Sequence, residues 1–240
     1  MAWRSRLLGN ERICCGCDSQ QCADFGEGPK NTFREDFREL RLSPITDLLV
    51  VSNILLYVAM ARSAGAIAPS AEDLIRWGGN YAPLTAYGQW WRLFSAAFLH
   101  LDPWHLYFNM IGLLGFGSIV ERAYGKSVIM GVYLACIFAA SSTSMVWHPF
   151  IVTLGASGGV FGLLGFLIPP LAAGGLSVHS KRLRNPAQTF CVSLAFNLII
   201  SAIVPFIDNS AHIGGLTAGL GIGFAFVLLG NRATVQLQWL

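Results

Sequence analysis

Long apolar stretches alternate with short polar segments along most of this chain. A helix needs about 20 mostly apolar residues to cross the hydrocarbon core of a bilayer. Each such stretch is expected to be helical, because a helix pairs its backbone polar groups within the segment. The pattern therefore predicts an all-α polytopic membrane protein, a bundle of six transmembrane helices. The six windows lie at about 45–62, 104–121, 126–147, 156–173, 188–206 and 210–229.

The two ends of the chain are more polar than its middle. Residues 1–44 are expected to form a soluble cytoplasmic tail, since they lack the apolar run of a secretory signal. Residues 45–230 would form the six-helix domain, and residues 231–240 a short cytoplasmic C-terminal tail. Composition agrees with a membrane location, because only 12% of the 240 residues are charged, against about a quarter in soluble domains.

The distribution of Lys and Arg predicts an orientation. With the N-terminus inside, and leaving the distal tail aside, the inner segments hold nine of these residues and the outer segments only Arg62, Arg76 and Arg92. The positive-inside rule then favours a multi-pass protein with both termini in the cytoplasm, and we expect it in the plasma membrane. The net charge of +3 gives no footprint of nucleic-acid binding. The expected surroundings are therefore the lipid bilayer, with no nucleic acid.

Few strongly polar side chains fall inside the apolar windows, where such groups are functional candidates. His105, Ser157 and His212 each lie near the start of a window that begins on the outer side, and Asn109 is one turn after His105. At about 1.5 Å of rise per residue, all four would lie in one outer layer of the bilayer. A nucleophile, a base and two side-chain donors at one depth is the arrangement that acyl transfer requires. Each residue alone has a simpler explanation, such as helix packing or a bond to its own helix.

Glycines follow these polar residues at helical spacing. Gly158 and Gly162 come after Ser157, and Gly215, Gly219 and Gly223 come after His212. Small residues four apart let two membrane helices approach closely, although this spacing is also common in ordinary packing. The glycines would allow a serine and a histidine on different helices to reach hydrogen-bond distance.

Together these residues resemble the rhomboid family of intramembrane serine proteases. The resemblance covers about residues 45–230 and all six windows in order. Taken as a set, its motifs are highly specific. They are the runs His105 to Asn109, Gly155 to Gly158, and Ala211 to Gly215 leading to Gly219, with Glu121-Arg122 followed by Gly125, and the pair Trp91-Arg92.

The resemblance implies a role for each matching residue. Ser157 would be the nucleophile and His212 its general base. The Ser157 N–H, His105 and Asn109 would form the oxyanion hole. A third catalytic role for Asp208 is conceivable, but helix capping by Asp208, Asn209 or Ser210 is favoured. The residues with an implied structural role are Trp91, Arg92, Glu121, Arg122, Gly215 and Gly219.

The expected function is therefore an intramembrane serine endopeptidase that needs no cofactor or metal and acts on transmembrane substrates. One alternative is a catalytically silent rhomboid-like protein that binds membrane clients. A transporter or proton channel is a further alternative, but such proteins usually place polar sites near the bilayer midplane. Bound Zn²⁺, lipidation and no special role all stay open for a cysteine cluster in the tail, although its spacing departs from that of usual zinc knuckles. The cluster consists of Cys14, Cys15, Cys17 and Cys22.

Overall fold

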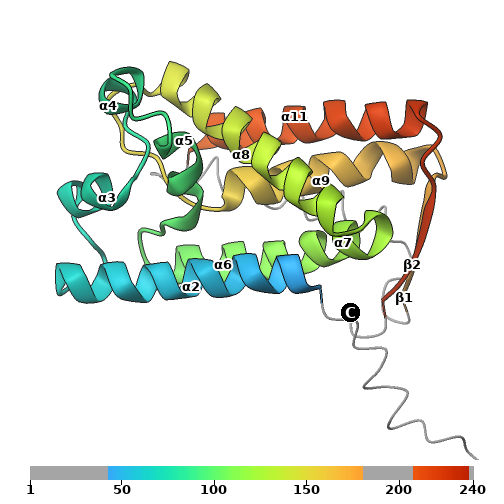
Figure 1. Cartoon of the computed structure of the whole chain (residues 1–240), viewed down its shortest axis with the longest axis horizontal. Helices are drawn as coiled ribbons and strands as arrows, with labels where there is room; N and C mark the ends of the chain where they lie inside the picture. Colours follow the sequence, from blue (N-terminus) through green and yellow to red (C-terminus); the bar gives the residue numbers. More distant parts are fainter. Residues whose placement is uncertain (1–42, 181–207, 238–240) are drawn as a thin grey trace, which may run out of the picture. The chain divides into compact units, whose positions relative to one another are not determined.

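The fold comes from a computed structural model that describes residues 43–180 and 208–237. The described elements are mostly helical (Figure 1). In chain order they are α2 (Pro44–Ala64), α3 (Ala71–Trp77), α4 (Ala82–Ala86), α5 (Arg92–Ser95), η2 (Ala96–Phe98), α6 (Pro103–Gly112), η3 (Leu113–Gly117), α7 (Ser118–Tyr124), α8 (Lys126–Trp147), α9 (Ser157–Ala172), β1 (Leu176–Ser180), α11 (Asn209–Leu228) and β2 (Ala233–Leu237).

Helix α2 is held at its start by a carboxylate from a distant part of the chain. Glu121 accepts hydrogen bonds from the backbone N–H groups of Ile45 at 3.0 Å and Thr46 at 2.9 Å, and from Thr46 Oγ1 at 2.8 Å. The first N–H groups of a helix have no partner within it, and the helix dipole favours a negative charge there. Glu121 thus caps α2 and connects it to α7.

The second predicted span is one continuous helical run. Helix α6, the π-helical segment η3 and α7 follow one another without a gap, and the backbone stays right-handed helical at both junctions. The Asp102 side chain caps the start of the run by accepting from the N–H groups of Trp104 at 2.8 Å and His105 at 2.9 Å. This cap fixes the first turn, which carries His105.

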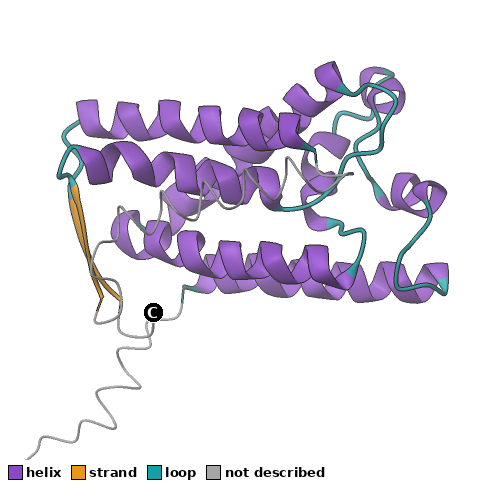
Figure 2. Ribbon diagram, turned by 180° about the vertical axis from the view of Figure 1, so that it is seen from behind, coloured by secondary structure: helices purple, strands orange, loops and turns teal. Residues whose placement is uncertain are grey.

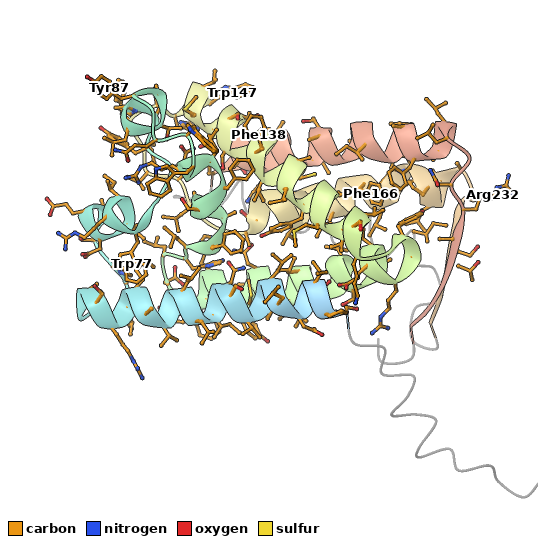
Figure 3. All side chains as sticks on the ribbon, in the orientation of Figure 1. Trp77, Tyr87, Phe138, Trp147, Phe166 and Arg232 are labelled. Carbon is orange, nitrogen blue, oxygen red and sulfur yellow. The ribbon has the colours of Figure 1, made fainter. Side chains whose placement is uncertain are left out.

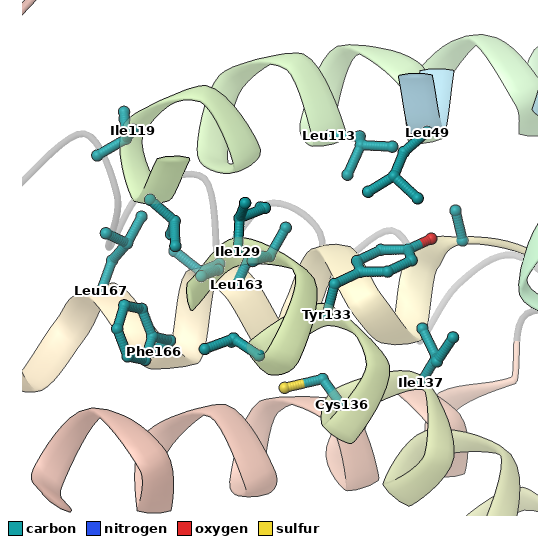
Figure 4. Close-up of a cluster of buried hydrophobic side chains, with 14 of the residues drawn as sticks. Leu49, Leu113, Ile119, Ile129, Tyr133, Cys136, Ile137, Leu163, Phe166 and Leu167 are labelled. Atoms are coloured by element: carbon teal, nitrogen blue, oxygen red, sulfur yellow. The ribbon is translucent and has the colours of Figure 1, made fainter. Parts of the chain in front are cut away.

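Helices α8, α9 and α11 pack most extensively against one another, and α9 with α11 is the pair in closest contact. Figure 1 shows α9 and α11 side by side with α8 crossing them. In a bilayer such packing depends on close van der Waals contact rather than on release of water. Buried apolar side chains from α2, η3, α7, α8 and α9 form one cluster (Figure 4), and its members include Leu49, Leu113, Ile119, Ile129, Tyr133, Cys136, Ile137, Leu163, Phe166 and Leu167.

The long segment between α2 and α6, predicted as an outer loop, is folded into short helices. Ser70 and Asp73 form a capping box that starts α3, with the Asp73 N–H donating to Ser70 Oγ at 3.2 Å. Tyr87 and Trp90 are exposed on this segment. Figure 3 shows Tyr87 at the same end of the bundle as Trp147 of α8. Trp and Tyr are enriched where a membrane meets water, and this placement is compatible with such a location.

Two short strands were not expected from the sequence. Strands β1 and β2 pair in parallel, with Leu176 opposite Ala233 and Ser180 opposite Leu237 (Figure 2). Residues 233–237 therefore form a strand where a simple tail was expected. Five-residue strands carry little periodic signal, and their pairing partner lies more than fifty residues away in sequence.

Three described helices, α2, α8 and α11, are long and apolar enough to cross a membrane, and α9 is a shorter apolar helix. They coincide with the predicted windows 45–62, 126–147, 210–229 and 156–173. The window at 188–206 lies outside the described residues. The total of six spans therefore stays a prediction.

Candidate active site

Ser157 is the first residue of α9 and directly follows a tight turn. Gly155 in this turn has a φ of 113°, in the left-handed region that favours glycine. A Cβ at position 155 would also lie 2.7 Å from the His105 ring. The Gly155 N–H donates to the Ala96 carbonyl at 2.9 Å, which fixes the turn against η2. The turn presents the half-buried Ser157 hydroxyl at the N-terminal end of a helix.

His212 lies in the first turn of α11 and faces Ser157. Its Nε2 atom is 2.9 Å from Ser157 Oγ, within hydrogen-bond distance. The imidazole stacks on the Phe161 ring with centroids 4.2 Å apart and planes 13° apart, and the residue is 7% exposed. Two residues predicted to act together therefore meet across two helices.

The glycines of α9 and α11 explain how the two helices come close enough. A Cβ at Gly215 would lie 2.0 Å from the Gly158 carbonyl oxygen, and one at Gly219 would lie 1.9 Å from that of Gly162. Gly223 is similar, because its Cβ would lie 2.5 Å from a backbone carbonyl of α9. A backbone carbonyl within a helix has little freedom to move aside. The interface therefore requires glycine at these positions.

His105 and Asn109 lie together on α6 beside the turn that precedes Ser157. Asn109 Nδ2 donates to the His105 carbonyl at 2.9 Å, which leaves a second N–H on the same nitrogen. A Cβ at Gly155 would be 2.7 Å from His105 Nε2 and 3.8 Å from Asn109 Nδ2. Both side chains therefore reach the Ser157 turn, as a pair of oxyanion donors would require.

Asp208 caps α11. Its carboxylate accepts from the Ala211 N–H at 3.0 Å and from the hydroxyls of Ser144 and Ser210. Within residues 43–180 and 208–237, His212 Nδ1 has no hydrogen-bond partner. The geometry therefore agrees with the capping role favoured for Asp208, and the described part of the chain holds a Ser–His pair rather than a triad.

Arg92 connects parts of the segment between α2 and α6. The guanidinium donates to Gln89 Oε1 at 2.7 Å and to the carbonyls of Ile75 at 2.7 Å and Gly79 at 2.9 Å. It also lies 4.7 Å from the centroid of the Trp91 ring, a cation–π contact. Trp91 and Arg92 are thus placed for a structural role.

Arg122 contacts the start of the described bundle. Its Nε donates to Ser43 Oγ at 3.3 Å, beside the α2 cap formed by Glu121. The Glu121-Arg122 pair is therefore placed to fix α7 against the N-terminal end of α2.

Sequence reasoning missed two buried polar residues near the site. Asn80 is 1% exposed and pairs with the segment before Ser157, and His100 is 0% exposed and packs edge-on against His105 with ring centroids 5.1 Å apart. Both lie between the apolar windows, where polar residues are ordinary. The signals in the sequence were the run Gly78-Gly79-Asn80 and a second histidine five residues before His105.

In the ranges 43–180 and 208–237, no group of His, Cys, Asp and Glu side chains could hold a metal ion. The four tail cysteines lie outside these ranges. Zinc binding or lipidation of the tail therefore stays a prediction.

Known proteins match most of this chain. The family model described as the Rhomboid domain matches residues 87–229. The chain is 36% identical over 185 residues to Rhomboid protease GluP of Bacillus subtilis (strain 168), covering 77% of this chain and 34% of that protein. It is 33% identical over 175 residues to Rhomboid-like protease 1 of Toxoplasma gondii, covering 71% of this chain and 59% of that protein. It is 27% identical over 212 residues to Rhomboid protease AarA of Providencia stuartii, covering 80% of this chain and 75% of that protein. The chain thus spans between about a third and three quarters of the length of these relatives.

Proposed function

The chain belongs to the rhomboid family, and on this premise we propose that it is an intramembrane serine endopeptidase with a Ser157–His212 dyad. The observation that carries the proposal is the 2.9 Å separation of His212 Nε2 and Ser157 Oγ. Residues 45–230 would be the protease domain, flanked by the tails 1–44 and 231–240.

Acylation begins with the Ser157 hydroxyl. Its Oγ attacks the carbonyl carbon of the scissile peptide bond while His212 Nε2 accepts the hydroxyl proton. The tetrahedral intermediate then expels the amine, which takes the proton from His212 and leaves an acyl ester on Ser157. In the described part of the chain no carboxylate is hydrogen-bonded to His212 Nδ1. The stack on Phe161 supports the role of His212 as the base, because it holds the imidazole plane in place without such a partner.

The negative charge of the tetrahedral intermediate needs donors that are already in position. The Ser157 backbone N–H at the start of α9, His105 and the second N–H of Asn109 Nδ2 surround the turn from which Ser157 attacks. Fixed donors in a water-poor site stabilise the oxyanion strongly, because they need no reorganisation during the reaction.

Deacylation needs water inside the membrane. A water molecule on the acyl ester gives its proton to His212 Nε2 and attacks the ester carbonyl, and the released Ser157 takes the proton back. The polar side chains of His105, Asn109, Ser157 and His212 are costly in lipid, so a wet cavity open to the outer face would serve both their solvation and hydrolysis.

Substrates in this proposal are transmembrane segments of other membrane proteins or their outer juxtamembrane edges. A helix hides its carbonyl groups in hydrogen bonds, so the substrate must unwind locally before attack. Segments that contain Gly or Pro should therefore be favoured, because these residues weaken a helix. A small residue at the cut is what the resemblance to the rhomboid family implies. The proposed orientation has both termini in the cytoplasm of a plasma-membrane protein with six spans, one of them at 188–206.

The experiment is cleavage of a panel of model transmembrane substrates in proteoliposomes, with cut sites mapped by mass spectrometry. The wild type should cut within or beside the transmembrane segments, and Ser157→Ala should not. Ser127→Ala, which changes an exposed serine on α8, is the matched control and should cleave like the wild type. Equal cleavage by Ser157→Ala would reject the proposal.

The alternative is a rhomboid-like protein that binds membrane clients without cutting them. The hydrogen-bond distance between Ser157 and His212 favours the protease over this alternative. A folded wild type that binds transmembrane segments but cuts none of the panel would favour the client-binding function.

A further inference from the structure

Asn80 joins the outer segment to the chain that leads into Ser157. Its backbone N–H donates to the Thr153 carbonyl at 2.9 Å, and the Thr153 N–H donates back to the Asn80 carbonyl at 2.8 Å. The two residues form an isolated antiparallel bridge, four positions before Ser157. The nucleophile's turn is therefore anchored on one side by Asn80 and on the other by the Ala96 carbonyl, which accepts from Gly155.

The Asn80 side chain fixes this bridge to two helices. Its Nδ2 donates to the Ser141 carbonyl of α8 at 3.0 Å and to Thr153 Oγ1 at 3.3 Å, while its Oδ1 accepts from Thr85 Oγ1 of α4 at 2.8 Å. Both amide hydrogens and one carbonyl lone pair are thus used in a site where the residue is 1% exposed. A fully satisfied buried network of this kind rigidifies the groups that it joins.

The backbone beside Asn80 leaves no room for a shift. A Cβ at Gly79 would lie 2.7 Å from Val152 Cγ1 and 2.9 Å from the Leu74 carbonyl oxygen. Residues 79–80 are therefore in close contact with residues 152–153. A displacement of Asn80 would carry Thr153 and the following turn with it.

From these contacts we infer that Asn80 is a positioning residue for catalysis, which sets the place of the Ser157 N–H and Oγ by holding Thr153. This inference rests on the proposed function of Ser157 as the nucleophile. The hydrogen-bond partners of Asn80 are Thr153, Ser141 and Thr85, and neither Ser157 nor His212 is among them. Asn80 acts through the turn at 153–156, which also faces His105 at Gly155. A displacement of about 1 Å at a reacting centre costs on the order of 10² in rate.

The test compares buried asparagines in the full chain. Asn80→Ala removes the hydrogen bonds of the Asn80 side chain. Thr153→Val removes Thr153 Oγ1, which accepts from Asn80 Nδ2 at 3.3 Å and donates to the Asn80 carbonyl at 3.5 Å. Asn53→Ala is the matched control, because Asn53 is 0% exposed and donates to the Leu49 carbonyl within α2 at 2.7 Å. For each variant the readouts are the rate of Ser157 labelling by a fluorophosphonate, kcat and KM for a cleaved transmembrane substrate, and the thermal unfolding midpoint.

Asn80→Ala should lower the labelling rate and kcat by on the order of 10², with KM unchanged. Thr153→Val should show a smaller loss of the same kind. Asn53→Ala should lower the unfolding midpoint but label and cleave at the wild-type rate. Wild-type labelling and kcat in Asn80→Ala, or an equal loss in Asn53→Ala, would overturn the inference.

Two further outcomes are informative. If Asn80→Ala does not fold, Thr153→Val decides by the same criterion, and wild-type kcat in that variant overturns the inference. If wild-type protein is not labelled at Ser157 at all, the nucleophile itself is rejected. Failure of the proposed function is thus distinguished from failure of the inference about Asn80, because unlabelled wild type is seen before any variant is compared.

Discussion

Gly215 lies so close to Gly158 that a Cβ at position 215 would come within 2.0 Å of the Gly158 carbonyl oxygen. Ser157 directly precedes this contact on α9, and His212 lies three residues before it on α11. The approach of the two backbones and the 2.9 Å distance between Ser157 Oγ and His212 Nε2 are therefore one structural feature.

Enlarging a glycine in this interface should separate the helices. Gly219→Ala places a methyl group where the Gly162 carbonyl oxygen lies 1.9 Å away, and a helical carbonyl cannot rotate out of the way. Overpacking costs about 1–3 kcal/mol in typical cores, and we expect at least the upper end here. Unfolding in detergent should show the loss of stability, and substrate cleavage should fall with it.

The control for this prediction lies on the same helix. Gly221 is exposed, and a Cβ there would meet no atom within 4 Å. Gly221→Ala should leave cleavage unchanged and should not destabilise the protein. Equal behaviour of Gly219→Ala and Gly221→Ala would show that the close approach of α9 and α11 is not needed.

The proposed oxyanion donors should act mainly in the transition state. Asn109→Ala should lower kcat by on the order of 10²–10³, and His105→Ala should have a similar effect. A donor that acts only in the transition state changes kcat and kcat/KM equally and leaves KM nearly constant. Steady-state cleavage kinetics measure this split. Tyr107→Ala, an exposed change on the same helix (53% exposed), should keep the wild-type kcat. A rise in KM alone would argue against the oxyanion role.

Glu121→Gln should destabilise the fold without touching the dyad. The amide keeps one acceptor oxygen but loses the charge and one of the contacts to the start of α2. Hydrogen bonds to charged groups contribute about 1.5–3 kcal/mol each, so a loss of that size in the free energy of unfolding is expected. Urea or thermal unfolding gives the value. Glu72→Gln, on the exposed face of α3, should be neutral by comparison.

His100 should make stability depend on pH. It is fully buried between η2 and α6, and desolvation holds the pKa of its imidazole well below the usual range, with nearby His105 as a second cause. The folded state therefore keeps His100 neutral, while the unfolded chain binds a proton below about pH 6.5. The free energy of unfolding that the neutral, buried His100 contributes is fully present above about pH 6.5 and is lost as the pH falls below that value.

Unfolding midpoints from pH 8 to pH 4 test this dependence. His100→Gln should flatten the decline below about pH 6.5 relative to the wild type. Ser127→Ala, an exposed change on α8, should leave the decline as it is. A decline of equal steepness in wild type and His100→Gln would assign it to other groups.

The sequence predicted the elements with a strong local signal. The window 126–147 has the same bounds as α8, and the windows at 45–62 and 210–229 differ from α2 and α11 by one or two residues at each end. The spacing of polar and glycine residues also anticipated that Ser157, His212, His105 and Asn109 would meet. The length of an apolar run fixes each helix within a single segment. The meeting of the four polar residues was predicted instead from their common depth in the bilayer and from the family resemblance.

The features that were missed depend on partners far apart in the chain. Asn80 and Thr153 are separated by 73 residues, and β1 pairs with β2 across the segment from 181 to 232. The capping role of Glu121 was likewise visible only once Thr46, 75 residues away, was placed beside it. Residue type alone does not reveal such pairings, because a polar residue outside an apolar window has many acceptable neighbours.

The Ser157–His212 dyad is tested most directly by the labelling rate of Ser157 with a fluorophosphonate, in wild type and in His212→Ala, with the modified residue identified by mass spectrometry. We expect the wild type to be modified at Ser157 alone. His212→Ala, folded to the same extent, should react on the order of 10²–10⁴ times more slowly, because the hydroxyl has lost its base. Modification of another residue, or an unchanged rate at Ser157 in His212→Ala, would rule out the proposed dyad.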